Sequence, residues 1–175
     1  MKAKRAELHT QRLVLKCYAP EDMDALLALL CSEEVSRTFM VPEFESREQA
    51  EGLFQKLLEI SALPDRVEYG VYLNGKLIGL VNESGLEGDT VEIGYVIAPD
   101  FWGKGYASEA AGAVIDELFR MGFQHVIAGY FEENPASRRV MEKCGMHPIE
   151  KTEDDEYRGK VHHCLFMGID APVSD

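Results

Sequence analysis

Two glycines separated by one residue, Gly103 and Gly105, lie where an expected strand ends and an expected helix begins. Pro99 ends the strand, because proline has no backbone N–H to donate to a sheet. Glycines let the backbone approach a ligand closely, and the first amides of a helix are unpaired donors at the positive end of its dipole. This arrangement is suited to binding a phosphate group.

The glycines alone leave several interpretations of this loop. A nucleotide-binding Walker A loop is excluded, because the segment 98–105 lacks its first glycine and a final Ser or Thr. The dinucleotide pattern GxGxxG, which would indicate a nicotinamide-dependent oxidoreductase, is incomplete because Ser108 replaces its third glycine. An ordinary flexible loop before a helix is the other alternative.

Hydrophobic periodicity and turn signals predict the elements that position this loop. Strands are expected over residues 8–18, 67–73, 76–81, 90–98, 125–130, 146–149 and 161–169. Helices are expected over residues 20–31, 46–60, 105–121 and 134–145. Three consecutive strands in the middle of the chain favour an α+β fold with a mixed sheet over a doubly wound fold.

Composition and charge restrict the function classes. The 175 residues suit a single domain spanning 1–175, and 18 basic against 31 acidic residues give a net charge of −13. Such a charge opposes nucleic-acid binding and favours cationic ligands such as amines. We expect a cytoplasmic protein, because the basic N-terminus is followed by no apolar leader and the apolar runs are too short to span a membrane.

The cysteines and histidines predict no metal site. The four cysteines, at 17, 31, 144 and 164, have neither disulfide-framework nor zinc spacing. His162 and His163 are adjacent, so on a strand they point to opposite faces.

Three segments carry a resemblance to a known family. The segment from Gly94 to Ala110, Gly-Tyr-x-x-x-Pro-x-x-Trp-Gly-x-Gly-Tyr-Ala-x-Glu-Ala, resembles the acetyl-CoA loop of GNAT acyltransferases. Residues 10–15 resemble the opening strand of the RimJ/RimL-type ribosomal-protein N-terminal acetyltransferases, and residues 134–146 resemble their second cofactor motif. The resemblance covers roughly residues 8–169. It implies the GNAT fold, a central mixed twisted sheet of about seven strands flanked by four helices, with acetyl-CoA as co-substrate.

The resemblance also implies a set of cofactor-binding residues. The pyrophosphate is expected on the backbone amides of the loop and on one hydroxyl of the following turn: Gly103, Lys104, Gly105, Tyr106, Ala107 and Ser108. Trp102 stands where many members have Gln or Arg, as is usual in the RimL-like branch. The pantetheine arm is expected to pair with the backbone of Val96, Ile97 and Ala98. Asn134 corresponds to a residue that contacts the CoA arm, although it is equally suited to cap a helix.

The catalytic residues implied by the resemblance are less well defined. Met141 stands where many members have a tyrosine that protonates the leaving thiolate, so Ser137, as in RimL-like members, is the candidate general acid. Either Glu156 or Glu92 is the candidate general base, and solvent is the alternative. The acidic run 153–156 could equally be a solvated turn.

Together these residues predict transfer of acetyl from acetyl-CoA to a primary amine by direct attack in a ternary complex. The RimL-like resemblance favours a protein N-terminal α-amine as acceptor. The alternatives are a small-molecule amine (a polyamine, an amino acid or a drug) and a non-catalytic CoA-binding module. Acidic residues at 33, 34, 43, 45 and 153–156 are either a rim around the acceptor or scattered surface acids. At the family level the resemblance also implies a homodimer.

Overall fold

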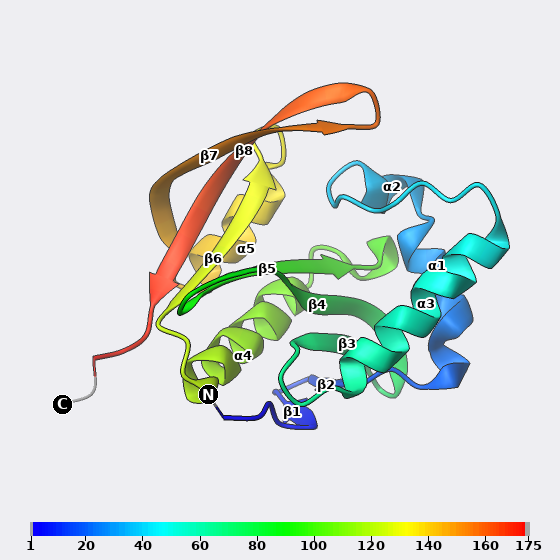
Figure 1. Cartoon of the computed structure of the whole chain (residues 1–175), viewed down its shortest axis with the longest axis horizontal. Helices are drawn as coiled ribbons and strands as arrows, with labels where there is room; N and C mark the ends of the chain where they lie inside the picture. The colour runs from blue at the N-terminus through cyan, green and yellow to red at the C-terminus, as the bar shows by residue number, and fades with distance from the viewer. Residues whose placement is uncertain (1, 174–175) are drawn as a thin grey trace.

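A computed structural model describes residues 2–173, and its centre is one mixed sheet of eight strands (Figure 1). The strands are β1 (Glu7–His9), β2 (Leu13–Lys16), β3 (Glu68–Leu73), β4 (Lys76–Glu87), β5 (Thr90–Ile97), β6 (His125–Phe131), β7 (His147–Tyr157) and β8 (Lys160–Asp170). Their order across the sheet is β1-β2-β3-β4-β5-β6-β8-β7. All neighbouring pairs are antiparallel except β5 and β6.

Five α-helices flank the sheet: α1 (Met23–Leu30), α2 (Glu33–Ser36), α3 (Arg47–Ala62), α4 (Tyr106–Met121) and α5 (Pro135–Lys143). The predicted start of this helix at residue 46 is confirmed, since Ser46 is the N-cap of α3 and its hydroxyl accepts a hydrogen bond from the amide of Gln49. The predicted end of α4 at Gly122 is confirmed as well, with that glycine at φ 114°. None of the helices within residues 2–173 is long and apolar enough to cross a membrane.

The α+β mixed sheet is confirmed, with one strand and one helix more than predicted. The expected strand 8–18 is two antiparallel strands joined by a turn. The hydroxyl of Thr10 accepts a hydrogen bond from the amide of Leu13 at 2.9 Å and stabilises this turn. The additional helix, α2, is capped by Ser32, whose hydroxyl accepts the amide of Val35. The chain over 20–22 is a short 3-10 turn rather than the start of α1.

The strand β7 is much longer than the predicted strand 146–149, whereas β8 extends the predicted strand 161–169 by one residue at each end. Arg158 and Gly159 adopt φ values of 51° and 73°, which form a tight turn between β7 and β8. The acidic run 153–156 therefore lies within β7 rather than in a turn. In Figure 1 this β7–β8 hairpin projects beyond the rest of the sheet and faces α2.

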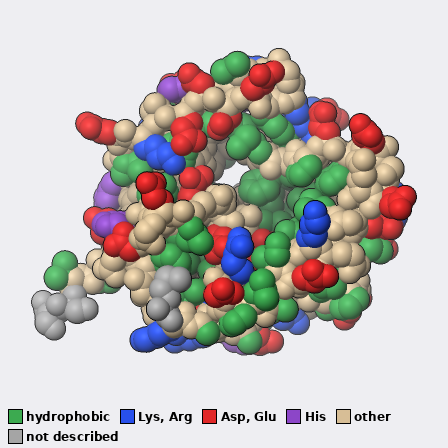
Figure 2. Space-filling model, viewed as in Figure 1, with side chains coloured by type: hydrophobic (Ala, Val, Ile, Leu, Met, Phe, Trp, Pro, Cys, Tyr) green, Lys and Arg blue, Asp and Glu red, His purple; other side chains and the backbone are tan. Residues whose placement is uncertain are grey.

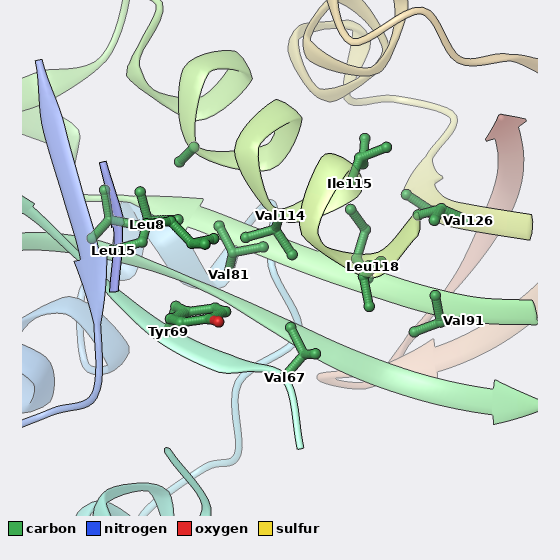
Figure 3. Close-up of a cluster of buried hydrophobic side chains, with 14 of the residues drawn as sticks. Leu8, Leu15, Val67, Tyr69, Val81, Val91, Val114, Ile115, Leu118 and Val126 are labelled. Carbon is green, nitrogen blue, oxygen red and sulfur yellow. The ribbon is translucent and has the colours of Figure 1, made fainter. Parts of the chain in front are cut away.

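Helices cover both faces of the sheet. One face carries α4, whose apolar side packs on residues from β1 to β6; Figure 3 shows Val114, Ile115 and Leu118 above Val81 and Val91. The other face carries α1 and α3, which pack around Phe54 and Leu80. Burial of these two clusters orders the central strands that carry the site.

The parallel pair β5–β6 separates partway along the sheet. Only three residues of β5, Thr90 to Glu92, pair with β6, and β6 then continues along β8. From Ile93 onward β5 is paired on its β4 side alone. An open strand edge therefore leads directly to the glycine loop.

Candidate active site

The glycine loop has the backbone geometry that the sequence predicts. Gly103 and Gly105 have φ values of 73° and 81°, in the left-handed region that favours glycine. Gly105 is the N-cap of α4, so the amides of the first helical turn have no partner within the helix. The hydroxyl of Ser108 donates to the carbonyl of Gly105 at 3.1 Å. The result is a compact set of unpaired donors suited to phosphate oxygens.

An ion pair from the N-terminal strands holds this loop in place. The guanidinium of Arg12 donates to the carboxylate of Glu109 at 2.7 Å and to the carbonyl of Lys104 at 2.9 Å. The Thr10 hydroxyl donates to the same carboxylate at 2.6 Å. Burial opposes charge on Glu109, but Thr10 and Arg12 outweigh it and hold its pKa below the ordinary value. These contacts connect the turn 10–12 to the loop 103–108 and to the first turn of α4.

The strand β5 offers fewer free backbone groups than the sequence predicts. The amide of Ala98 donates to the carbonyl of Ile78 at 2.7 Å, so it faces β4. Hydrogen-bonding directions alternate along an antiparallel strand, so the backbone of Val96 also faces β4 and that of Ile97 faces the open edge. The Ile97 carbonyl already accepts the indole N–H of Trp102 at 2.6 Å. Of the three positions, only Ile97 presents a free amide to the open edge.

A pocket of about 350 Å³ lies between the loop, the open edge of β5 and α5. Its lining includes most of the predicted cofactor residues: Val96, Ile97, Trp102, Gly103, Gly105, Tyr106, Ala107, Ser108 and Asn134. Lys104 and Ala98 are outside this lining, and the Lys104 side chain is exposed. Asn134 does cap α5, since its side-chain oxygen accepts the Ser137 amide at 3.4 Å.

Two cations in the cofactor pocket are additions to the predicted set. Arg139 and Lys143 line the pocket beside Ala136 and Val140. The spacing 136, 139, 140 and 143 places all four on one face of α5. That periodicity is readable in the sequence and could have added the two basic residues to the candidate set.

A second pocket, of about 430 Å³, lies on the α1 and α3 side of the open edge. Figure 2 shows the molecule hollowed between the β7–β8 hairpin and the helices on the opposite side, with hydrophobic side chains inside. Leucines of α1 and α3 line it together with polar residues of β3, β4 and β5. The two pockets share four residues: Thr38, Phe39, Tyr95 and Ser137.

Tyr95 and Ser137 form a polar contact where the pockets meet. The Tyr95 hydroxyl lies 2.9 Å from Ser137 Oγ and donates to the Ser137 carbonyl at 3.0 Å. Burial raises the pKa of Tyr95, so the hydroxyl stays protonated. The structure therefore brings Ser137 to the junction and adds Tyr95, which the sequence interpretation did not include.

The two candidate bases lie in different surroundings. Glu92 lines the second pocket, 3.4 Å from the Lys151 ammonium and 3.3 Å from the Ser84 hydroxyl. Glu156 is exposed and outside that lining. Because side chains alternate along β7, it is on the opposite face from Asp155 and Glu153, which do line the pocket. Of the expected acidic rim, 33, 34, 43 and 45 are outside the lining.

Two polar residues on neighbouring strands line the inner part of the second pocket. Glu68 on β3 is 3% exposed and is directly opposite Asn82 on β4. The Tyr18 hydroxyl donates to the Glu68 carboxylate, and burial raises the pKa of Glu68 to about 7. Asn82 Oδ1 is buried and receives no hydrogen bond from residues 2–173. A glutamate in the otherwise apolar segment 67–73 was the sequence signal for this pair.

The thiol of Cys144 is unsuited to nucleophilic catalysis. Burial raises its pKa to about 11, and it donates to the Ser108 carbonyl at 3.5 Å. Met141 is buried in the main core. Within residues 2–173, no group of three or more His, Cys, Asp or Glu side chains is arranged to hold a metal ion.

Comparisons with known proteins agree with this geometry. The sequence matches the acetyltransferase (GNAT) domain family over residues 12–147. The uncharacterized N-acetyltransferase YoaA of Bacillus subtilis (strain 168) is 31% identical over 143 residues, which are 79% of this chain and 81% of YoaA. A GNAT-family acetyltransferase structure from Bacillus anthracis has a TM-score of 0.81 at 26% identity, covering 94% of this chain and 98% of that one.

The fold is also that of RimL, the ribosomal L7/L12 alpha-N-protein acetyltransferase, solved in complex with coenzyme A. The TM-score is 0.80 at 17% identity, covering 92% of this chain and 95% of RimL. This similarity concerns the fold, whereas the domain match and YoaA carry the family assignment. The chain belongs to the GNAT family and is an acetyl-CoA-dependent N-acetyltransferase.

Proposed function

We propose that the protein transfers acetyl from acetyl-CoA to a primary amine by direct attack within a ternary complex. The observation that carries this proposal is the meeting of two pockets at Tyr95 and Ser137. One pocket holds the cofactor and the other holds the amine, so both reactants reach the same point without a covalent enzyme intermediate. Holding two reactants in this way removes much of the entropic barrier to their reaction.

Acetyl-CoA is proposed to lie along the open edge of β5. The pyrophosphate contacts the amides of Gly103, Lys104, Gly105, Tyr106 and Ala107 and the Ser108 hydroxyl. Arg139 and Lys143 on α5 add positive charge to that side of the pocket. The free amide of Ile97 is placed to donate to the thioester carbonyl as it becomes an oxyanion. Other residues of the predicted set stabilise this surface. Val96 and Ala98 bond to β4, the Trp102 indole donates to Ile97, and Asn134 caps α5.

Ser137 and Tyr95 supply the proton that the leaving thiolate needs. The amine nitrogen attacks the thioester carbon, the C–S bond breaks, and the sulfur takes a proton from the Ser137 hydroxyl. Tyr95, hydrogen-bonded to that hydroxyl, orients it, and the serine recovers its proton from solvent. Glu92 lines the amine pocket and is the general base, and Lys151 keeps it oriented. Glu156 is the weaker candidate because its side chain faces away from the pocket.

Two acceptor classes follow from different observations. Similarity in fold to RimL favours a protein N-terminal α-amine. The interior carboxylate of Glu68 favours a small-molecule amine, the class developed below. Four free thiols fit a cytoplasmic location, which we propose together with a homodimer.

Thermal melting with acetyl-CoA tests the cofactor assignment. A ligand at about 100 times its Kd stabilises a protein by about 2.7 kcal/mol. For a chain of this size that is a rise in Tm of about 5–10 °C. We expect the rise with acetyl-CoA and not with NAD or ATP. Absence of a rise would refute the cofactor site, whereas binding without acetyl transfer to any amine would identify a non-catalytic CoA-binding module.

A further inference from the structure

We propose that Glu68 and Asn82 form a subsite for a second cationic group of the acceptor, which makes the substrate a linear diamine or polyamine. This inference rests on the proposed acetyl transfer and assigns the inner end of the acceptor pocket. The reacting amine lies at the junction of the pockets, and the second ammonium lies against β3 and β4.

The subsite is built by one register pair of the sheet. Glu68 of β3 is directly opposite Asn82 of β4, and Asn82 is directly opposite Gly94 of β5. Residues opposite one another on neighbouring strands project to the same face. Glu68 and Asn82 therefore project from neighbouring positions on one face of the sheet, and both line the pocket.

Both residues have acceptor capacity that the protein does not use. Asn82 Oδ1 is buried without a hydrogen-bond donor among the described residues. Within residues 2–173, Glu68 has no cation within 4.0 Å of its carboxylate, although its residue is 3% exposed. A buried carboxylate without a cation is costly, and an unpaired buried amide oxygen adds to that cost. An ammonium group, with three N–H donors and a positive charge, satisfies both.

The groups that surround Glu68 do not replace that cation. The ammonium of Lys4 donates to the backbone carbonyls of Ser61 and Glu68 instead of the carboxylate. Arg66 pairs with Glu83, and Tyr18 contributes a neutral hydroxyl. Burial dominates and raises the pKa of Glu68 to about 7. A bound ammonium would favour the charged carboxylate and lower that pKa.

The geometry sets the length and character of the ligand. Glu68 and Gly94 are two strand spacings apart, so the subsite lies ~10 Å from the start of the open edge of β5. Leu53, Leu57 and Leu80 line the same pocket. A methylene chain with an amine at each end matches these leucines and places one nitrogen at each end of the pocket.

Competition between matched amines tests the subsite. Acetyl transfer from acetyl-CoA is measured with 1,7-diaminoheptane, 1,8-diaminooctane, n-octylamine and 8-amino-1-octanol, because diamines of this length span the pocket. We expect kcat/KM for a diamine to exceed that for n-octylamine by about tenfold or more, mainly through KM, since each tenfold is about 1.4 kcal/mol of binding. The amino alcohol is expected to behave like the monoamine, because it lacks the second charge.

Variants connect this preference to the residues. In Glu68→Gln the diamine-to-monoamine ratio of kcat/KM should fall at least fivefold. Glu117→Gln is the control, because Glu117 is also a buried carboxylate but lies on α4, outside the pocket. In this variant the ratio should stay within about twofold of that of the parent protein. Asn82→Leu keeps the side-chain size, removes the orphan oxygen and should lower the ratio in the same direction, even where Glu68→Gln fails to fold.

The outcomes separate this inference from the function on which it rests. Transfer to n-octylamine and the diamines with equal efficiency would overturn the subsite and leave the acetyltransferase function intact. A preference for the amino alcohol equal to that for the diamine would show a neutral hydrogen-bonding subsite and would also overturn the inference. Transfer to none of the four amines, with acetyl-CoA bound, would contradict the small-molecule acceptor itself and leave the N-terminal α-amine to be tested with peptides.

Discussion

The Tyr95 hydroxyl lies 2.9 Å from Ser137 Oγ, joining β5 to the first turn of α5 across the separation of the two central strands. This contact closes the wall between the cofactor pocket and the acceptor pocket, because both residues line both pockets. It also connects the proposed proton donor to a second hydroxyl that is buried and protonated.

We expect Ser137→Ala to lower kcat at least tenfold, because general acid catalysis commonly contributes about 10²–10⁴-fold. Tyr95→Phe should lower kcat by a smaller factor, since the serine proton remains but the hydroxyl that orients it is lost. Acetyl-CoA binding, measured by calorimetry, should change by less than about threefold in either variant. Unchanged turnover in Ser137→Ala would exclude it as the general acid.

Two substitutions, Glu92→Gln and Glu156→Gln, distinguish the two candidate general bases. Glu92→Gln should lower kcat/KM at least tenfold, because Glu92 lines the acceptor pocket and can accept the amine proton. The kcat/KM of Glu156→Gln should stay within about twofold of the parent value, because that carboxylate is exposed on the opposite face of β7. The reverse result would assign the base to Glu156, and two silent variants would assign it to solvent.

The ion pair between Arg12 and Glu109 should control cofactor affinity rather than turnover. Arg12→Ala releases both the Glu109 carboxylate and the Lys104 carbonyl, so the loop loses its anchor. We expect the Kd for acetyl-CoA to rise about tenfold, equivalent to about 1.4 kcal/mol. Arg138→Ala is the control, because that arginine pairs with Glu142 on an exposed face of α5. Equal affinity in both variants would contradict an anchoring role.

The raised pKa of Glu68 predicts a particular dependence of stability on pH. Between the ordinary carboxyl pKa of 4.5 and about 7, the folded protein holds a proton that the unfolded chain has released. The contribution of Glu68 to the free energy of unfolding therefore falls as pH rises through this window, by at most about 3 kcal/mol. Urea denaturation at pH 5 and pH 7.5 should show this loss in the parent and a smaller loss in Glu68→Gln.

Glu117 provides a control of opposite sign for that measurement. Burial opposes its charge, but the Arg120 guanidinium and the Arg5 amide outweigh burial and hold the pKa of Glu117 below the ordinary value. Its stabilising contribution is present above pH 4.5 and is lost as pH falls below that value. Glu117→Gln should therefore leave the loss of stability between pH 5 and 7.5 in place. Removal of that loss by Glu117→Gln would contradict its assignment to Glu68.

The glycine loop was predictable because all of its determinants are local. Gly103 and Gly105 specify the left-handed backbone, Pro99 ends the strand, and helical periodicity predicts α4 directly after them. The mixed α+β sheet followed from the same short-range signals. Errors of extent arose at turns: Thr10 divides the first strand, and Arg158 adopts a positive φ that nonglycine residues rarely adopt.

The acceptor side of the site depended on tertiary structure. Alternation along a strand tells which residues share a face, but it does not tell which strands are neighbours. Glu68 faces Asn82 only because β3 pairs with β4 in one register, and Tyr95 reaches Ser137 only because β5 and β6 separate after Glu92. Local sequence therefore determined the glycine loop and its unpaired amides, whereas long-range strand pairing decided where the two pockets meet and which carboxylates line the second one.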